Sequence, residues 1–226
     1  MKLRLTAILA VMISLPASAK EPPSRPNALP SQNEPLRQEL LAMFKLDQKV
    51  RIEGLQALHK QGVAVGQTPS LGDTRVLLAV FKQTFSMSVV DDAHRRRLDA
   101  IINQHGWPGK TLVGPDGANA AWLIAQHADL DRAFQKKCLE KMEALPQGEV
   151  EPRFIAYLTD RILVGEHKPQ RFGTQMDGQF KPQPIEDEAN VDKRRAEMGL
   201  NPLAVYLKEA KDAYEHFARG EEPKLK

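Results

Sequence analysis

The stretch from Ala118 to Ala128 constrains the fold more than any other part of the sequence, because it is apolar almost all round. Its centre reads Ala121-Trp122-Leu123-Ile124-Ala125. A helix that lacks a polar face is normally enclosed by other elements. We therefore expect this segment to be a central helix that the rest of the chain surrounds.

Apolar residues at helical spacing predict further helices on both sides of this segment. They fall at 36–60, in a stretch with Val76 and Val80, from Asp91 to Ile102, from Phe134 to Leu145, from Pro152 to Ile162, at 189–198 and from Pro202 onward. Asp91 and Asp92 favour a helix start, since carboxylates are stabilised at the positive N-terminal end. Gly199 is expected to end one helix and Asn201 to cap the last.

Three segments interrupt the helical pattern. Residues 63–72 and 106–117 are rich in glycine and proline and predict loops. Around the turn pair Asp177-Gly178, alternating side chains near 169–184 predict a β-hairpin, and Pro182 and Pro184 confine its second strand to an edge. The expected fold is therefore mainly α: a single-domain helical bundle with one small β-hairpin.

The first 19 residues have the parts of a cleavable signal peptide: a positive start with Lys2 and Arg4, an apolar run over 5–15, and the small residues Ala17-Ser18-Ala19. The run is shorter than the roughly twenty residues that cross a bilayer. We expect cleavage between Ala19 and Lys20 and a periplasmic or secreted protein. The alternative is an uncleaved anchor or a buried N-terminal helix.

The remaining chain divides into three parts. Residues 20–35 contain five prolines and predict a flexible leader. Residues 36–219 are expected to form the helical domain, and 220–226 a polar tail.

The net charge bounds the class of partner. Lys and Arg number 32 against 29 Asp and Glu, giving +3, and two of the positive charges lie in the expected signal peptide. Nucleic-acid binding needs clustered positive charge, so this balance argues against it and against a polybasic membrane anchor. The expected partner is a small molecule or a peptide.

Cys138 is the only cysteine, so no internal disulfide can form. It shares a helical stripe with Phe134 and Met142, which favours a buried small hydrophobe over a reactive thiol.

Two places put polar residues where the pattern favours apolar ones, which is typical of functional sites. Gln126 and His127 each lie one turn beyond an apolar residue of the central helix. Both point into packed surroundings, either as a structural network or as a ligand or general-base site. Arg161 falls on the buried stripe of its helix. It needs an anionic ligand or a salt bridge, with candidate partners Asp131, Asp187 and Asp192.

A third place combines the loop His105-Gly106-Trp107-Pro108-Gly109 with hairpin residues that carry amides and a hydroxyl: Gln170, Thr174 and Gln175, beside Gly173. Such residues suit the wall of a ligand pocket, and they equally suit a tightly packed turn.

Standard catalytic and cofactor motifs are absent from the sequence. It has no His-Glu-x-x-His, paired-cysteine zinc spacing, P-loop, Gly-x-Ser-x-Gly or dinucleotide fingerprint. His127 and Asp131 stand four residues apart, but this spacing is common by chance. We therefore expect no metal site and no cofactor.

Several of these strings resemble an uncharacterised bacterial family, a domain of unknown function. The matching strings are Gly106-Trp107-Pro108, Ala121 to Asp129, Asp160-Arg161, Gln170, Gly173-Thr174-Gln175, Pro184 to Asp187, Val191 to Arg195, Gly199-Leu200 and Pro202-Leu203. Phe172 stands where related sequences commonly have Tyr. The resemblance spans about residues 91–207 and implies a shared domain and a shared pocket, without a reaction.

Two functions follow from these residues. In the first, an exported helical protein binds a small molecule, peptide or glycan fragment through Trp107, Gln126, Arg161, Gln170, Thr174 and Gln175. In the second, a hydrolase or transferase uses His127 or His105 as general base and Arg161 as an anion-binding group. Both require these side chains to meet beneath the tryptophan-bearing loop.

Overall fold

A computed structural model describes residues 31–63 and 72–220. The expected signal peptide, most of the expected leader, residues 64–71 of the expected loop and residues 221–226 of the expected tail lie outside these ranges. The described residues form seven α-helices and one short 3₁₀ helix: α2 (Glu34–Lys60), α3 (Thr74–His105), α4 (Lys110–His127), α5 (Arg132–Glu143), α6 (Pro152–Gly165), η1 (Glu188–Asn190), α7 (Val191–Glu197) and α8 (Leu203–Arg219). The mainly α fold class is confirmed.

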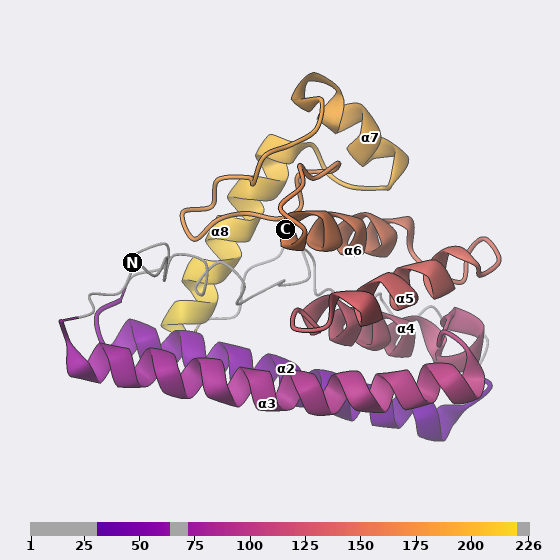
Figure 1. Cartoon of the computed structure of the whole chain (residues 1–226), viewed down its shortest axis with the longest axis horizontal. Coiled ribbons are helices and arrows are strands. Elements are labelled where there is room, and N and C mark those ends of the chain that lie inside the picture. The colour runs from indigo at the N-terminus through magenta and orange to yellow at the C-terminus, as the bar shows by residue number, and fades with distance from the viewer. Residues whose placement is uncertain (1–30, 64–71, 221–226) are drawn as a thin grey trace.

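The helices are arranged in layers (Figure 1). The long helices α2 and α3 lie side by side with opposite directions and form the base. Above them lie α4 and α5, then α6, while α8 leads from α7 back to α2. None of the helices in the described ranges combines the length and apolarity needed to cross a membrane.

The central helix is α4, as its apolar sequence predicts. Trp122, Leu123 and Ile124 are at most 2% exposed and belong to the main core. The Trp122 ring stacks on Phe154 of α6 with centroids 4.3 Å apart, and its Nε1 donates to the Phe154 carbonyl at 3.0 Å. Cys138 is fully buried in the same core, and burial raises the pKa of its thiol, which suits a small hydrophobe.

The expected helix start at Asp91 is wrong, because α3 continues through it. Val76, Val80, Met87 and Leu98 keep one buried stripe along the whole helix, with no proline or glycine to end it. Asp91 is stable inside the helix because its carboxylate pairs with Arg51 of α2.

The expected loop at 106–117 is also mostly helical, since α4 begins at Lys110. The chain departs from helical geometry at Gly114, where φ is 73°, and resumes the helix at Pro115. Glycine tolerates this conformation, and a proline fits the first turn of a helix. The last helix likewise begins at Leu203 after Pro202, one position later than predicted.

The predicted β-hairpin does not form. Between Gln170 and Ile185 only two isolated bridges occur, Gln170 with Ile185 and Met176 with Pro182. The turn after Asp177 is present, since its N–H donates to the Lys181 carbonyl at 2.8 Å. The strands are missing because the N–H groups of Arg171, Phe172 and Thr174 bind the Asp160 carboxylate instead, and the prolines supply no N–H.

Candidate functional site

The buried stripes of α2 and α3 both change from apolar to polar midway. The stripe of α2 is Leu36, Leu40, Met43, Asp47, Arg51, Gly54 and Leu58. On α3, Asp91 and His94 follow the buried Met87 at intervals of four and three residues. These polar residues lie on neighbouring helices next to the carboxyl end of α4, where Asp47, Arg51 and Asp91 meet His127.

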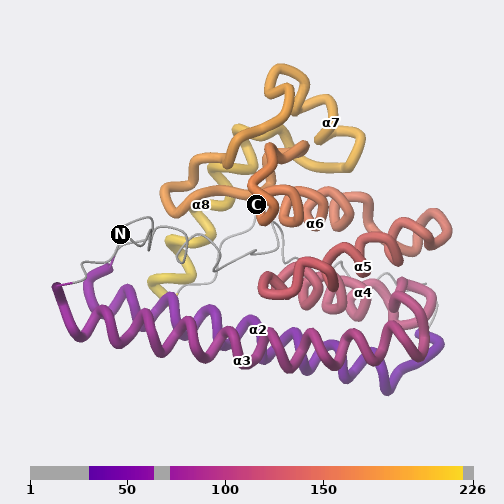
Figure 2. The backbone as a smooth tube through the Cα atoms, viewed as in Figure 1, coloured from indigo at the N-terminus to yellow at the C-terminus, as the bar shows by residue number. Residues whose placement is uncertain are grey.

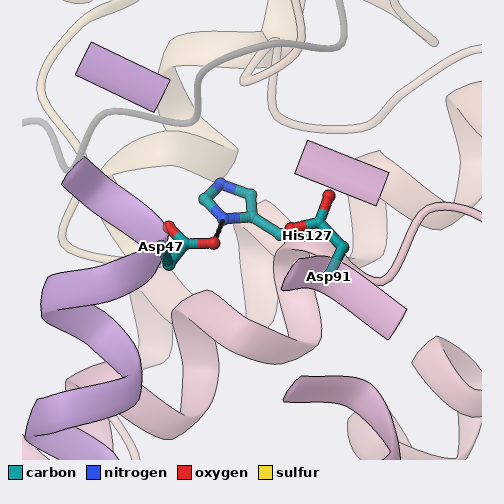
Figure 3. A group of neighbouring side chains, drawn as sticks. All are labelled: Asp47, Asp91 and His127. Atoms are coloured by element: carbon teal, nitrogen blue, oxygen red, sulfur yellow. Dashed lines mark hydrogen bonds and ion pairs between the residues drawn. The ribbon is translucent and has the colours of Figure 1, made fainter. Parts of the chain in front are cut away.

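His127 reaches these two helices from the last turn of α4 (Figure 3). Its Nδ1 lies 2.8 Å from Oδ1 of Asp47 and 3.0 Å from Nε of Arg51. The side chains of His127 and Asp47 are each 1% exposed. Nδ1 cannot donate to Asp47 and accept from Nε–H of Arg51 at the same time. Asp47 can only accept and is the nearer partner, so this contact favours the proton on Nδ1, and Nε–H of Arg51 then donates to the Asp47 carboxylate at 3.3 Å. In this tautomer Asp47 also holds the orientation of the ring.

The other ring nitrogen of His127 is left without a partner. Nε2 is buried and forms no hydrogen bond in the part of the chain that the structure describes. It lies on the side of the ring away from both carboxylates (Figure 3). With the proton on Nδ1, Nε2 is an acceptor in the neutral ring, and buried polar atoms normally have a partner. In that tautomer it is a buried acceptor that no described residue satisfies.

Asp47, Asp91 and His127 also have the composition of a metal site, because one ligand atom from each lies within 4.8 Å of the others. Arg51 occupies the cation position among them. Its Nη2 lies 2.5 Å from Oδ1 of Asp91 and 3.2 Å from Oδ1 of Asp47. A divalent ion would have to displace this guanidinium, so the donor set fits Arg51 better than a metal.

The two carboxylates differ in acidity. Burial alone raises the pKa of Asp47, but His127 and Arg51 outweigh it and hold the pKa well below its ordinary value. Burial dominates at Asp91 and raises its pKa, despite Arg51 and His127. Pairs with divergent pKa values are typical of acid–base sites. Asp47 stays ionised and is able to stabilise a protonated His127.

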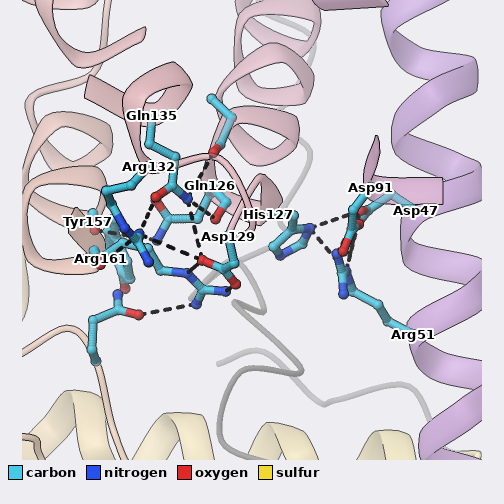
Figure 4. Close-up of polar contacts among 12 residues, drawn as sticks. Asp47, Arg51, Asp91, Gln126, His127, Asp129, Arg132, Gln135, Tyr157 and Arg161 are labelled. Atoms are coloured by element: carbon cyan, nitrogen blue, oxygen red, sulfur yellow. Dashed lines mark hydrogen bonds and ion pairs between the residues drawn. The ribbon is translucent and has the colours of Figure 1, made fainter. Parts of the chain in front are cut away.

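A second polar network lies on the other side of His127 (Figure 4). Nε of Arg161 donates to Oδ1 of Asp129 at 2.8 Å, Nη2 binds Oδ2 of the same carboxylate, and Nη1 donates to Oε1 of Gln175 at 3.1 Å. The salt bridge expected for Arg161 therefore forms, but with Asp129 rather than the three aspartates considered from the sequence. Asp131, for example, caps α5 by accepting from Phe134 N–H at 2.9 Å.

Gln126 and Gln135 join this network to the backbone around the end of α4 (Figure 4). Nε2 of Gln126 donates to the Tyr157 carbonyl at 3.3 Å, while its Oε1 is buried without a partner among the described residues. Nε2 of Gln135 donates to the Gln126 carbonyl at 3.0 Å. Gln126 thus contributes one open acceptor on the α6 side of the helix.

The remaining candidates of this network hold the segment after α6 in place. Asp160 is fully buried and accepts from the N–H groups of Arg171, Phe172 and Thr174, and from the Thr174 hydroxyl. Gln170 donates to the carbonyl of Gln175 and accepts from its N–H, both at 2.8 Å. Gln170 and Thr174 therefore position Gln175, which contacts Arg161.

His105 and Trp107 lie apart from these groups. They precede the first turn of α4, whereas His127 ends the helix, and the segment from Pro115 to His127 alone rises by about 18 Å. His105 is exposed, and Trp107 is 4% exposed within the main core. The side chains expected to meet under the tryptophan loop gather instead at the opposite end of α4.

Sequence reasoning missed Asp47, Arg51, Asp91, His94 and Asp129. A signal for the first two was present, since they occupy consecutive positions of the apolar stripe of α2. Asp91 and His94 show the same signal on α3. The interpretation of Asp91 as a helix start concealed it.

The chain was compared with known proteins. A family described as "Family of unknown function (DUF6624)" matches residues 34–218. A search of curated proteins and a search of solved structures gave no significant match. The match extends from the first residue of α2 into the last turn of α8 and includes both polar networks. The chain therefore belongs to the DUF6624 family, whose function is unknown.

Proposed function

We propose that this protein is a hydrolase or transferase in which Nε2 of His127 acts as general base. The observation that carries the proposal is the state of the ring: Nδ1 is held by Asp47 at 2.8 Å, while Nε2 is buried and has no partner among the described residues. A histidine whose second nitrogen is held by a carboxylate is an arrangement typical of general-base catalysis.

The surrounding charges support this role. Asp47 remains a carboxylate because His127 and Arg51 outweigh its burial. When Nε2 takes a proton from the substrate or from water, the imidazolium that forms lies against this negative charge. Proton transfer back to the leaving group completes the cycle without a change in Asp47. Arg51 prevents Asp47 and Asp91 from repelling one another.

Arg161 contributes to the site through Gln175 and Asp129 in this proposal. Its charge is balanced by the Asp129 carboxylate. Burial raises the pKa of Asp129, but the positive charge of Arg161 and its hydrogen bond help lower the pKa overall. Asp129 is two residues from His127 and feels its charge. The Asp129–Arg161–Gln175 network therefore forms a polar wall beside the base, which can orient a substrate carrying hydrogen-bonding groups.

The test compares His127→Ala with His105→Ala, the same substitution at an exposed histidine at the far end of α4. The purified chains are incubated with chromogenic esters, amides, phosphodiesters and glycosides and with a bacterial extract analysed by mass spectrometry. We expect wild type and His105→Ala to turn over a common substrate and His127→Ala to lose roughly 10²–10⁴-fold in rate. Circular dichroism establishes that each variant is folded, and His127→Gln replaces His127→Ala if the latter is not.

Two results would overturn the proposal. Equal turnover by wild type and a folded His127 variant assigns the chemistry elsewhere. If a compound binds to the wild-type protein and is released chemically unchanged, and no substrate is turned over, the protein is a binding protein for a small molecule, peptide or glycan fragment.

We also propose that the protein is exported, on the basis of the signal-like residues 1–19. N-terminal sequencing of the mature protein is expected to begin at Lys20. An intact Met1 would rule out cleavage.

A further inference from the structure

One face of α3 carries large apolar side chains that remain exposed. We name it the α3 face; its residues and exposed fractions are Leu77 44%, Leu78 65%, Phe81 67%, Phe85 61% and Val89 53%. The rings of Phe81 and Phe85 are nearly parallel, with centroids 6.4 Å apart, and form a continuous aromatic surface. Exposed apolar residues that are contiguous in this way are typical of interaction surfaces.

The described helices leave this face open, because only α2 packs along this end of α3. The start of α3 extends past the ends of α4 and α5 (Figure 2). Its other side is covered, since Val76 and Val80 pack with Leu58 of α2 in a small separate core. The α2–α3 pair therefore buries one apolar side of α3 and presents the other outward.

We infer that the α3 face binds the α3 face of a second copy of this chain, with the two helices antiparallel. Four of its five residues are symmetric about position 83: Leu77 and Val89 are each six residues from it, and Phe81 and Phe85 are each two residues from it. Leu78 is the exception, because its counterpart at position 88 is a serine. A two-fold axis at this position places Phe81 against Phe85 of the other copy and Leu77 against Val89. Isologous contacts of this kind are the commonest in homo-oligomers.

Charges at the two ends of the face agree with this register. In the antiparallel arrangement Arg75 of one copy comes within reach of Asp92 of the other, and the reverse pair forms at the opposite end. Within one copy Arg75 pairs with Asp73 at 3.4 Å, and Asp92 pairs with Arg95 at 3.3 Å and Arg96 at 2.6 Å. The side chain of Arg75 is 82% exposed and that of Asp92 is 43% exposed, and exposed pairs of this kind contribute little, so both side chains can exchange partners in a dimer. A parallel arrangement would instead place like charges together.

The available area suits a modest dimer. The five exposed side chains present apolar surface on the order of 500 Å², near the upper end of the largest patch on a typical monomer. Flanking polar residues bring the contact towards the roughly 800 Å² per partner of a standard interface. We therefore expect a dimer that dissociates reversibly at micromolar concentrations.

Sedimentation velocity of the full chain over a range of concentrations tests the inference. Phe85→Glu is expected to raise the dimer dissociation constant about 100-fold, because it places a charge in the centre of the contact. Leu130→Glu is the matched control, since Leu130 is 87% exposed outside the face, and it should leave association unchanged. Arg75→Asp and Asp92→Arg should each weaken the dimer, and the double variant should restore it.

Three outcomes would overturn the inference. A wild-type chain that is monomeric at all concentrations has no such interface. A dimer that survives Phe85→Glu uses another surface. A dimer that is lost with Phe85→Glu but not restored by the double charge reversal has a different register or orientation.

Discussion

Asp47 and His127 are 80 positions apart in the chain, yet Oδ1 of the aspartate lies 2.8 Å from Nδ1 of the histidine. Both side chains are 1% exposed, and Arg51 contacts both. The contact joins α2 to the end of α4 and favours the tautomer on which the proposed base depends.

Asp47→Asn is expected to lower the free energy of unfolding by roughly 3–5 kcal/mol, because it leaves the buried Arg51 short of negative charge. Urea unfolding at neutral pH measures the change. Glu39→Gln, on the same helix and paired with the exposed Arg97, is the control and should cost about 1 kcal/mol or less. Similar losses for the two variants would contradict the role given to Asp47.

Asp47 and Asp91 should give the stability opposite dependences on pH. The pKa of Asp47 is lowered in the folded state, so its contribution is present above the unfolded pKa, about 3.9, and is lost as the pH falls. The pKa of Asp91 is raised, so its ionisation opposes folding and that penalty disappears on acidification.

Urea unfolding between neutral pH and about pH 3.5 separates the two effects. The stability difference between wild type and Asp47→Asn should shrink as the pH falls. The difference between wild type and Asp91→Asn should move in favour of wild type over the same interval. Parallel curves for the two variants would show that the acidities do not diverge.

Arg51→Met should convert the cluster into a metal site. The variant leaves the carboxylates of Asp47 and Asp91 and the ring of His127 within 4.8 Å of one another without their cation. It is expected to be less stable than wild type, and Zn²⁺ at about 100 times its dissociation constant should restore roughly 2.7 kcal/mol. Thermal unfolding with and without Zn²⁺ gives the measurement.

The control is Arg51→Met combined with His127→Ala, which lacks the nitrogen ligand and should gain little from Zn²⁺. A rise in the melting temperature of wild type with one equivalent of Zn²⁺ would mean that Arg51 does not hold the cation position.

Asp160→Asn should loosen the segment that carries Gln175. The Asp160 carboxylate accepts from three backbone N–H groups and a hydroxyl, whereas an amide offers one acceptor oxygen and turns an N–H₂ towards the other donors. We expect a loss of about 2–3 kcal/mol and faster hydrogen exchange at residues 171–174.

Asp177→Asn is the comparison for this variant. Asp177 also accepts from two backbone N–H groups, those of Gln179 and Lys181, but in an exposed turn. It should change the stability by less than about 1 kcal/mol. Unchanged exchange at residues 171–174 in Asp160→Asn would remove Asp160 from its anchoring role.

The sequence by itself determined the helices, the burial of α4 and the inward direction of Gln126, His127 and Arg161. These are local properties, because side chains three and four positions apart share a face of a helix whatever surrounds it. The same reasoning explains its errors. Asp91 and Asp92 resemble a helix start, but Asp91 pairs with Arg51 of another helix. The alternating side chains beside Asp177-Gly178 resemble a hairpin, but the backbone before this turn binds the Asp160 carboxylate.

Only the tertiary structure decided which polar groups meet. Helix packing brings Asp47 and Arg51 of α2, Asp91 of α3 and His127 of α4 to one level, and places His105 and Trp107 at the far end of α4. Which polar side chains become partners depends on the relative register and direction of separate helices. That arrangement is set by the packing of the whole core, which no short stretch of sequence encodes.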